Sequence, residues 1–398
     1  MRLTVMMSKI KLPRFPPRKA RKTPTLINFV VRWFDKFQFL PNPIPTSSPF
    51  DMKSRFKLLL LSAIDRTSIS RKARDLREQN LPIPSGEATL AWLKTKSVED
   101  ITTSQQTGFY QFLESLPENF QFARKQGMLL AIDCHTDPNY AKTLSPYICK
   151  GRKKASTHQS YKYITVIWLN APEPITLAVQ LLPIKHSTFK TVQSLLTPLL
   201  TQERIVGVLA DGGFYNWDLI QWLIHKQVFF IIRGRVNTGV KPLVQKHQEE
   251  LRQKGTHLVV DYHVNKGHTR KRLPVKLALC RAGDRIMALI VPPTCVLSGR
   301  RINELYRQRF TIETYYRQMH RFQIFSCSQH PAVRFIIVLL AFWLCNFWAY
   351  FKAPLNLLKS TSRRCRVDFV YTANDFCEFI RFSWHQTIFT GQVVFSRR

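Results

Sequence analysis

Apolar residues recur every three or four positions between Phe50 and Glu118, which is the spacing of amphipathic helices. The apolar runs lie at 56–64, 68–76, 88–93 and 108–116. Ser68 and Ser85 stand at the N-cap positions of two runs, where a hydroxyl accepts a bond from a free backbone N–H. The pattern therefore predicts a small helical domain over residues 51–125.

The hydrophobic pattern changes at Gly127, where short continuous apolar runs replace the helical spacing. Strands are predicted at 127–133, 161–170, 175–184, 205–211 and 228–234, and helices at 188–202 and 215–225. Three strands in succession, followed by strands that alternate with helices, are the element order of a ribonuclease-H-like α/β fold. Two of the predicted strands end in an acid, at Asp133 and Asp211.

Residues 235–300 interrupt this order with short β-like runs joined by basic turns, at 257–264, 276–282 and 284–291. A helix at 302–322 then resumes the core, and an apolar helix at 335–350 packs against the sheet. The expected organisation is a basic, Pro-rich arm with one short helix (1–50), a helical candidate DNA-binding domain (51–125), a ribonuclease-H-like core (126–234 and 301–355), a β-rich insertion (235–300) and a C-terminal tail (356–398).

The segment from Glu304 to Phe322 sorts its residues onto two sides of a helix, at about 100° per residue. One side carries Tyr306, Arg309, Glu313, Arg317 and His320. The other carries Leu305, Ile312, Tyr315, Met319 and Phe322, which form an apolar stripe that can dock on a core. We therefore expect one continuous helix whose accessible face holds an acid among cations and a phenol, an arrangement that suits a phosphodiester and a metal ion.

The net charge of the chain indicates what kind of macromolecule it binds. The chain has 60 Lys and Arg against 25 Asp and Glu, a net charge of +35, which favours nucleic acid over an anionic membrane. The eight cysteines show no zinc spacing, and the amino terminus lacks the apolar core of a signal peptide. The apolar run 335–351 is short, aromatic and contains Asn346, so it is interpreted as a core helix. A cytoplasmic, nucleoid-associated prokaryotic protein without a membrane span is expected.

Three carboxylates from two strand ends and a helix can meet at one edge of such a sheet. Asp133, Asp211 and Glu313 are the candidates, and oxygen ligands of this kind suit two Mg²⁺ or Mn²⁺ ions. Alternatives remain for each position. Asp137 could replace Asp133 as the ligand, the Asp-Gly pair at 211 is also a common turn signal, and Glu313 could be half of a surface salt bridge.

The spacing Y-x2-R-x3-E of Tyr306, Arg309 and Glu313 resembles the signature of DDE transposases of insertion-sequence family four. The stretches LAIDCH and LADGGFYN look like the two aspartate motifs of that group, and the resemblance covers about 127–322. It implies that Asp133, Asp211 and Glu313 bind catalytic metal and that Tyr306 and Arg309 hold phosphates near the cut. It also implies cleavage of double-stranded DNA at transposon ends, strand transfer, and a homodimer in a synaptic complex.

Two features depart from this family pattern. His320 occupies the place of the signature Lys, so Arg317 or Arg321 would have to supply a constant positive charge. Residues 235–300 contain no Trp or Phe, and Tyr262 is their one tyrosine, which disfavours a hairpin intermediate that needs an aromatic partner for a flipped base. Alternatives to an active transposase are a catalytically inert, transposase-derived DNA-binding protein and a nonspecific nuclease on the same fold.

Additional phosphate contacts are expected from basic residues outside the signature helix. Arg233 and Arg235 follow a predicted strand close to the proposed carboxylates. Basic clusters also lie at 18–21, 151–154 and 269–272.

Overall fold

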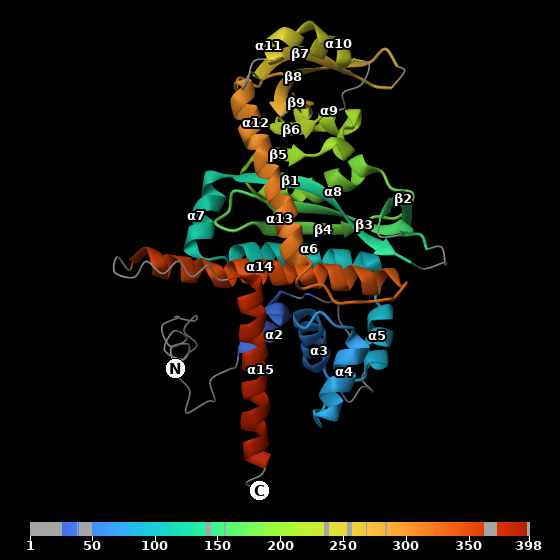
Figure 1. Cartoon of the computed structure of the whole chain (residues 1–398), viewed down its shortest axis with the longest axis vertical. Coiled ribbons are helices and arrows are strands. Elements are labelled where there is room, and N and C mark those ends of the chain that lie inside the picture. The colour runs from blue at the N-terminus through green and yellow to red at the C-terminus, as the bar shows by residue number, and fades with distance from the viewer. Residues whose placement is uncertain are drawn as a thin grey trace.

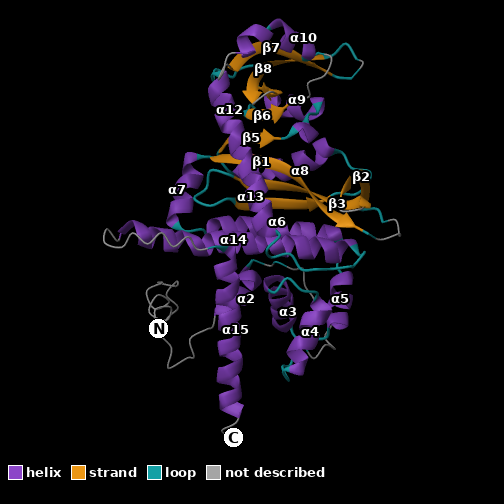
Figure 2. Ribbon diagram, viewed as in Figure 1, coloured by secondary structure: helices purple, strands orange, loops and turns teal. Residues whose placement is uncertain are grey.

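The structure is a computed structural model of the chain that describes residues 26–37, 39, 50–140, 145–154, 157–234, 239–252, 257–267, 269–282, 285–361 and 372–395. A mixed, nine-stranded sheet forms its centre, and most helices gather at one end of it (Figures 1 and 2). The architecture is mixed α/β and is consistent with a ribonuclease-H-like domain.

The first part of the chain is helical, as its apolar spacing predicts. Its helices are α2 (Leu26–Lys36), α3 (Met52–Ile64), α4 (Ile69–Glu78), α5 (Gly86–Lys94), α6 (Val98–Glu114) and α7 (Glu118–Gln126). The predicted N-caps are confirmed, because Ser68 Oγ accepts from the Arg71 N–H at 3.2 Å and Ser85 Oγ accepts from the Ala88 N–H at 3.0 Å. The short α7 was not predicted from the sequence.

The core strands are β1 (Met128–Asn139), β2 (Ile148–Lys154), β3 (Thr157–Trp168), β4 (Ile175–Leu181), β5 (Ile205–Ala210) and β6 (Phe230–Arg233). They are connected by α8 (Thr188–Gln202), the 3₁₀ turn η1 (Gly212–Phe214) and α9 (Trp217–His225). Strands β4, β3 and β1 pair antiparallel, whereas β1, β5 and β6 pair parallel. This is the succession expected from the sequence, and it places the ends of β1 and β5 side by side.

Strand β1 corrects one expectation, because it does not end at Asp133. It continues to Asn139 in antiparallel register with β3, and β2 adds a further strand on the far side of β3. Beyond Ile132 no strand in the described part of the chain pairs with β1 on the β5 side, so Pro138 removes a donor that no described strand there needs. Asp133 therefore lies within β1, at the point where the pairing with β5 stops.

The segment after β6 forms α10 (Lys241–Lys246), α11 (Gln248–Arg252), β7 (His257–Asn265), β8 (Arg272–Ala282) and β9 (Arg285–Val291). Its strands pair antiparallel with one another, and β9 pairs with β6 through Ile232 and Ile290. The three strands extend the central sheet, because β6 offers an open edge with free backbone groups.

The last part of the chain contains α12 (Gly299–Arg307), the 3₁₀ turn η2 (Gln308–Phe310), α13 (Thr311–Met319), α14 (Pro331–Thr361) and α15 (Ala373–Phe395). The expectation of one continuous helix over 302–322 is wrong, because η2 divides it. A 3₁₀ turn advances about 120° per residue against about 100° in an α-helix, so three residues rotate the following face by roughly 60°.

Helix α14 packs against strand β4 and against helices α5 and α6. Within the described ranges, it contains the one stretch, Pro331–Lys352, long and apolar enough to cross a membrane, and residues 332–349 of that stretch are all buried, as expected for a core helix. Its Trp343 stacks on Phe109 of α6, with ring centroids 4.6 Å apart, and its edge meets Trp33 of α2 at 5.7 Å. The expected basic arm therefore includes a helix packed into the core.

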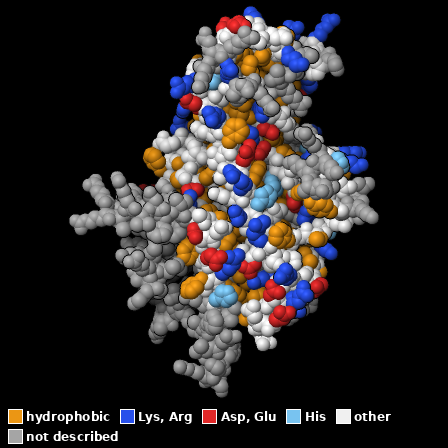
Figure 3. Space-filling view, viewed as in Figure 1, with side chains coloured by type: hydrophobic (Ala, Val, Ile, Leu, Met, Phe, Trp, Pro, Cys, Tyr) orange, Lys and Arg blue, Asp and Glu red, His pale blue; other side chains and the backbone are white. Residues whose placement is uncertain are grey.

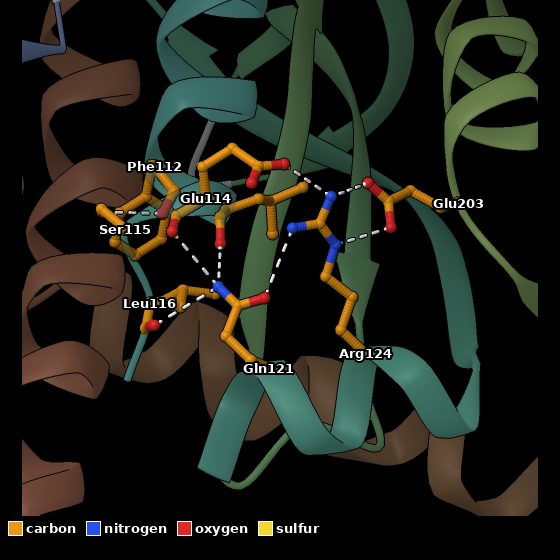
Figure 4. A network of polar contacts seen from close by, with 8 residues as sticks. Phe112, Glu114, Ser115, Leu116, Gln121, Arg124 and Glu203 are labelled. Carbon is orange, nitrogen blue, oxygen red and sulfur yellow. Dashed lines mark hydrogen bonds and ion pairs between the residues drawn. The ribbon is translucent and has the colours of Figure 1, made fainter. Parts of the chain in front are cut away.

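An ion-pair network fixes the start of the core strands (Figure 4). The Arg124 guanidinium of α7 binds both carboxylate oxygens of Glu203, at 2.7 and 2.6 Å, and reaches Glu114 at the end of α6 at 2.8 Å. The Met128 N–H then donates to the Arg204 carbonyl at 2.7 Å. These contacts set the register of β1 against β5, and thereby the relative positions of Asp133 and Asp211.

Candidate active site

Two candidate aspartates meet at the carboxyl edge of the parallel strands. Ile132 of β1 is the register partner of Ala210 of β5, so Asp133 and Asp211 are the next residues on neighbouring chains. Adjacent strands lie about 4.8 Å apart. Asp211 leaves the sheet at once and caps η1, since its Oδ1 accepts from the Gly213 N–H at 2.8 Å. Asp211 is thus both part of the Asp-Gly turn and one of the candidate metal ligands.

Glu313 reaches this edge from α13, which two tyrosines fix to the sheet. The Tyr316 hydroxyl lies 2.7 Å from Thr165 Oγ1, and Thr165 is the cross-strand partner of Asp133. The Tyr315 hydroxyl lies 2.7 Å from Thr176 Oγ1 on β4. Glu313 is exposed on the first turn of the helix. In Figure 3, acidic side chains gather near the middle of the molecular face, with basic and histidine side chains below them.

The charges of Asp211 and Glu313 both act on the Asp133 carboxyl. Burial raises the pKa of the Asp133 carboxyl to about 6, and the nearby charges of Asp211 and Glu313 act in the same direction. The Arg309 guanidinium and the Cys134 N–H act against this rise. Asp133 is therefore a largely buried acid with two acidic neighbours. A bound cation would stabilise its ionised form.

Arg309 and Tyr306 lie beneath these acids and are not on an accessible face, which corrects the expectation from the helical periodicity. Tyr306 is 0% exposed and Arg309 is 7% exposed, because η2, which contains Arg309, shifts the helical phase between α12 and α13. Arg309 Nη1 is 3.7 Å from Asp133 Oδ1, and its Nε has no hydrogen-bond partner among the described residues. Burial raises the pKa of Tyr306, whereas the cations Arg309 and Arg233 lower it.

The remaining predicted cations lie farther along the surface. Arg317 and Arg321 are exposed after Glu313, and Arg233 is exposed at the end of β6. Arg235 and the cluster at 18–21 lie outside the described residues, as do the side chains at 152–154. The cluster at 269–272 is exposed at the turn between β7 and β8.

His320 contacts a residue that the sequence did not single out. Its ring lies 5.2 Å from the ring of the buried His135, two positions after Asp133 on β1. His320 Nδ1 is 2.7 Å from Gln323 Oε1. The signal that could have identified His135 is its place on the same face of the strand as Asp133.

Asp137, the alternative to Asp133, has a different set of partners. Its carboxylate pairs with Arg334 Nη2 at 3.1 Å. Arg334 also donates to the Ser326 carbonyl at 2.6 Å and to the Pro138 carbonyl at 2.8 Å, which ties α14 to the extension of β1. Burial raises the pKa of Asp137, and Arg334 opposes this shift. Asp137 is thus engaged in a structural ion pair.

The donor set fits a hard divalent cation, because the neighbouring groups are carboxylate oxygens that repel one another. No three His, Cys, Asp or Glu side chains in the described part of the chain are close enough to form a complete metal cage. Asp133 and Asp211 are the two acids on adjacent strands, and Glu313 stands on a separate helix. An ion bound here would therefore also draw on water or phosphate oxygens, as Mg²⁺ commonly does.

The sheet order and its acidic edge are consistent with ribonuclease-H-like enzymes that act on nucleic acid. A family model described as the transposase DDE domain matches residues 124–347, which is more than half of the chain. The protein therefore belongs to the DDE transposases. This family implies a transposase or nuclease activity, DNA as a partner and, in general, the use of divalent metal ions. A search of curated proteins finds no match to the chain.

Proposed function

We propose that the protein is an active DDE transposase that cuts DNA at the ends of an insertion sequence and joins the 3′-hydroxyls to target DNA. The observation that carries this proposal is the register of β1 and β5, which makes Asp133 and Asp211 neighbours on adjacent strands; the charge of Glu313 also acts on Asp133. These are the residues that the resemblance to insertion-sequence family four assigns to the metal ions.

In this proposal Asp133 and Asp211 hold the ions and Glu313 completes the site. Two Mg²⁺ or Mn²⁺ ions bound there would activate a water or 3′-hydroxyl and stabilise the leaving oxygen. Arg309 positions the Asp133 carboxylate, because its Nη1 lies 3.7 Å from Asp133 Oδ1 beneath the site. Tyr306 supports the Arg309 guanidinium, which lies 5.6 Å from the centre of its ring.

Further parts of the proposal concern the DNA and the assembly. Arg317, His320, Arg321 and Arg233, together with Arg235, contact the DNA backbone near the cut. The helical region before α7 binds DNA outside the catalytic core. Two copies act together, because a transposon has two ends that must be held at once. The protein works in the cytoplasm on nucleoid DNA.

The test replaces Glu313 by Gln, which keeps the size and removes the charge. We expect Glu313→Gln to fold and bind transposon-end DNA normally, and to lose cleavage with Mg²⁺ or Mn²⁺ by roughly a thousandfold or more. Glu304→Gln is the matched control, because Glu304 is an exposed acid of α12 whose ion-pair partners among the described residues are Arg300 and Arg301. Near-wild-type cleavage by Glu313→Gln would remove this residue from the site.

Two further outcomes separate the alternatives. Precut ends that carry a 3′-hydroxyl are joined to target DNA by a transposase and not by a nonspecific nuclease. A wild-type protein that binds the ends but never cleaves them, with either metal, would support an inert DNA-binding protein.

A further inference from the structure

A largely apolar groove lies at the edge of the sheet opposite the candidate carboxylates. Its volume is about 870 Å³, and its lining includes Leu129 and Val206, at the starts of β1 and β5, and Phe229, directly before β6. The loop 292–297 after β9 and part of α12 complete the lining. Because β1, β5 and β6 run parallel, the six residues of β5 separate the groove from the acidic edge by about 20 Å.

The loop 292–297 is held by hydrogen bonds at its base. The Cys295 N–H donates to the Pro292 carbonyl at 3.0 Å, and Lys276 Nζ of β8 donates to the Cys295 carbonyl at 2.7 Å. Ser298 follows the loop as the N-cap of α12. The loop therefore leaves β9 and enters α12 at fixed points.

Val296 stands at the rim of the groove. It lines the groove and is nevertheless 92% exposed, the largest exposed fraction among the large apolar side chains of the described residues. Val206, inside the groove, is also exposed. An exposed apolar side chain beside an apolar hollow makes this surface complementary to itself. When two copies face each other across a twofold axis, the Val296 of each can enter the groove of the other.

The charges of the groove also favour a second copy as its occupant. The chain carries a net charge of +35, so two copies repel each other wherever their cations meet. Arg301 is the one charged residue among the described lining residues, and its Nη1 already pairs with Glu304 Oε2 at 3.3 Å. Two copies can therefore meet here without opposing like charges, whereas DNA or an acidic protein would find no unpaired cation in this lining.

We propose that this groove and the loop 292–297 form the contact between two copies of the chain, each copy inserting its loop into the groove of the other. The inference rests on the proposed function, which needs two copies, and it names the surface through which they meet. The acidic edges of both copies stay uncovered, because they lie at the other end of the parallel strands.

The first experiment is sedimentation velocity of the full chain at high salt, without DNA or divalent metal, over a range of protein concentrations. We expect the wild type to form a reversible dimer. Val296→Glu places a charge in the contact and should weaken the dimer by at least about a hundredfold. The side chain is exposed in the single chain, so the variant should fold normally, as circular dichroism can verify.

Ile184→Glu is the matched control for this substitution. Ile184 is an exposed apolar residue that follows β4, on the carboxylate side of the sheet, because Leu181 pairs with Tyr163 and Tyr163 pairs with His135. The substitution introduces the same charge far from the groove. The dimer of this variant should be as stable as that of the wild type.

The second experiment tests whether the loop of one copy occupies the groove of the other. Val206→Lys changes the groove and leaves the loop intact, and alone it should also weaken the dimer by about a hundredfold. An equal mixture of Val296→Glu and Val206→Lys can form a mixed dimer with one unaltered contact and one Glu–Lys contact. Its association should return to within about tenfold of the wild type.

The outcomes separate this inference from the proposed function, since association is measured without DNA or metal. A wild type that is monomeric at every concentration, a Val296→Glu dimer as stable as the wild type, or a mixture that shows no recovery would overturn the inference, whether or not the protein cleaves DNA. A wild type that dimerises through this surface and never cleaves transposon ends would refute the proposed function and leave the inference standing.

Discussion

Replacing Asp133 by Asn should make the metal-free protein more stable at pH 8 and at the same time abolish DNA cleavage. Burial and acidic neighbours raise the pKa of this carboxyl from 3.8 to about 6, so the folded protein holds its proton more tightly than the unfolded chain does. Stability contributed by the neutral acid is complete below pH 3.8 and is lost as the pH rises through about 6.

The size of the effect follows from the shift. About two pKa units at 1.36 kcal/mol each give about 3 kcal/mol of lost stability above pH 6. The Asp133 side chain is only 15% exposed, so solvent screens this interaction little. An Asn at this position carries no charge at any pH and should therefore recover up to about 3 kcal/mol at pH 8.

The assay is urea unfolding in EDTA at a series of pH values, for the wild type and Asp133→Asn. The difference in unfolding free energy should grow between about pH 4 and 6 and then stay constant. Asp218→Asn is the control, because Asp218 forms a surface pair with Lys266 at 2.8 Å and should change stability by less than about 1 kcal/mol. If Asp133→Asn is less stable than the wild type at pH 8, the account of strained, repelling carboxylates is wrong.

Three further changes test the surroundings of the site. Tyr316→Phe removes the bond to Thr165 and should cost about 1 kcal/mol and slow cleavage, with DNA affinity retained in a binding assay. Glu203→Ala leaves the Arg124 guanidinium with Glu114, an exposed carboxylate, as its remaining ion-pair partner among the described residues and should cost about 2 kcal/mol in urea unfolding, whereas Glu114→Ala should cost less than about 1 kcal/mol. His320→Lys should raise the cleavage rate at pH 8, because lysine keeps its positive charge at that pH; an unchanged rate would mean that neighbouring arginines already supply it.

Apolar spacing and capping residues were sufficient to predict several helices. The helix at 188–202 has the same bounds in α8, and the serine caps of α4 and α5 lie where the sequence placed them. The order of strands and helices also predicted that the ends of β1 and β5 meet, which brings Asp133 near Asp211. These features depend on neighbouring residues or on chain order.

The features that the sequence missed depend on distant contacts. The extension of β1 beyond Asp133 depends on pairing with β3, and Pro138 is tolerated within it because the pairing with β5 has ended. No periodicity reveals η2, and the assumed continuous helix therefore placed Tyr306 on the wrong side. The choice between Asp133 and Asp137 rests on Arg334, which is 197 positions beyond Asp137 in the sequence and pairs with it in the fold.

The aromatic packing around Trp343 has a consequence for how the chain acquires its structure during synthesis. Trp33 of α2 and Phe109 of α6 leave the ribosome more than two hundred residues before Trp343 does. Until α14 emerges, these rings lack the partner that buries them, and exposed apolar surface of this kind favours aggregation. The nascent protein should therefore depend on chaperones until its last third is made, and a fragment limited to 124–347 would expose Trp343 and fold poorly.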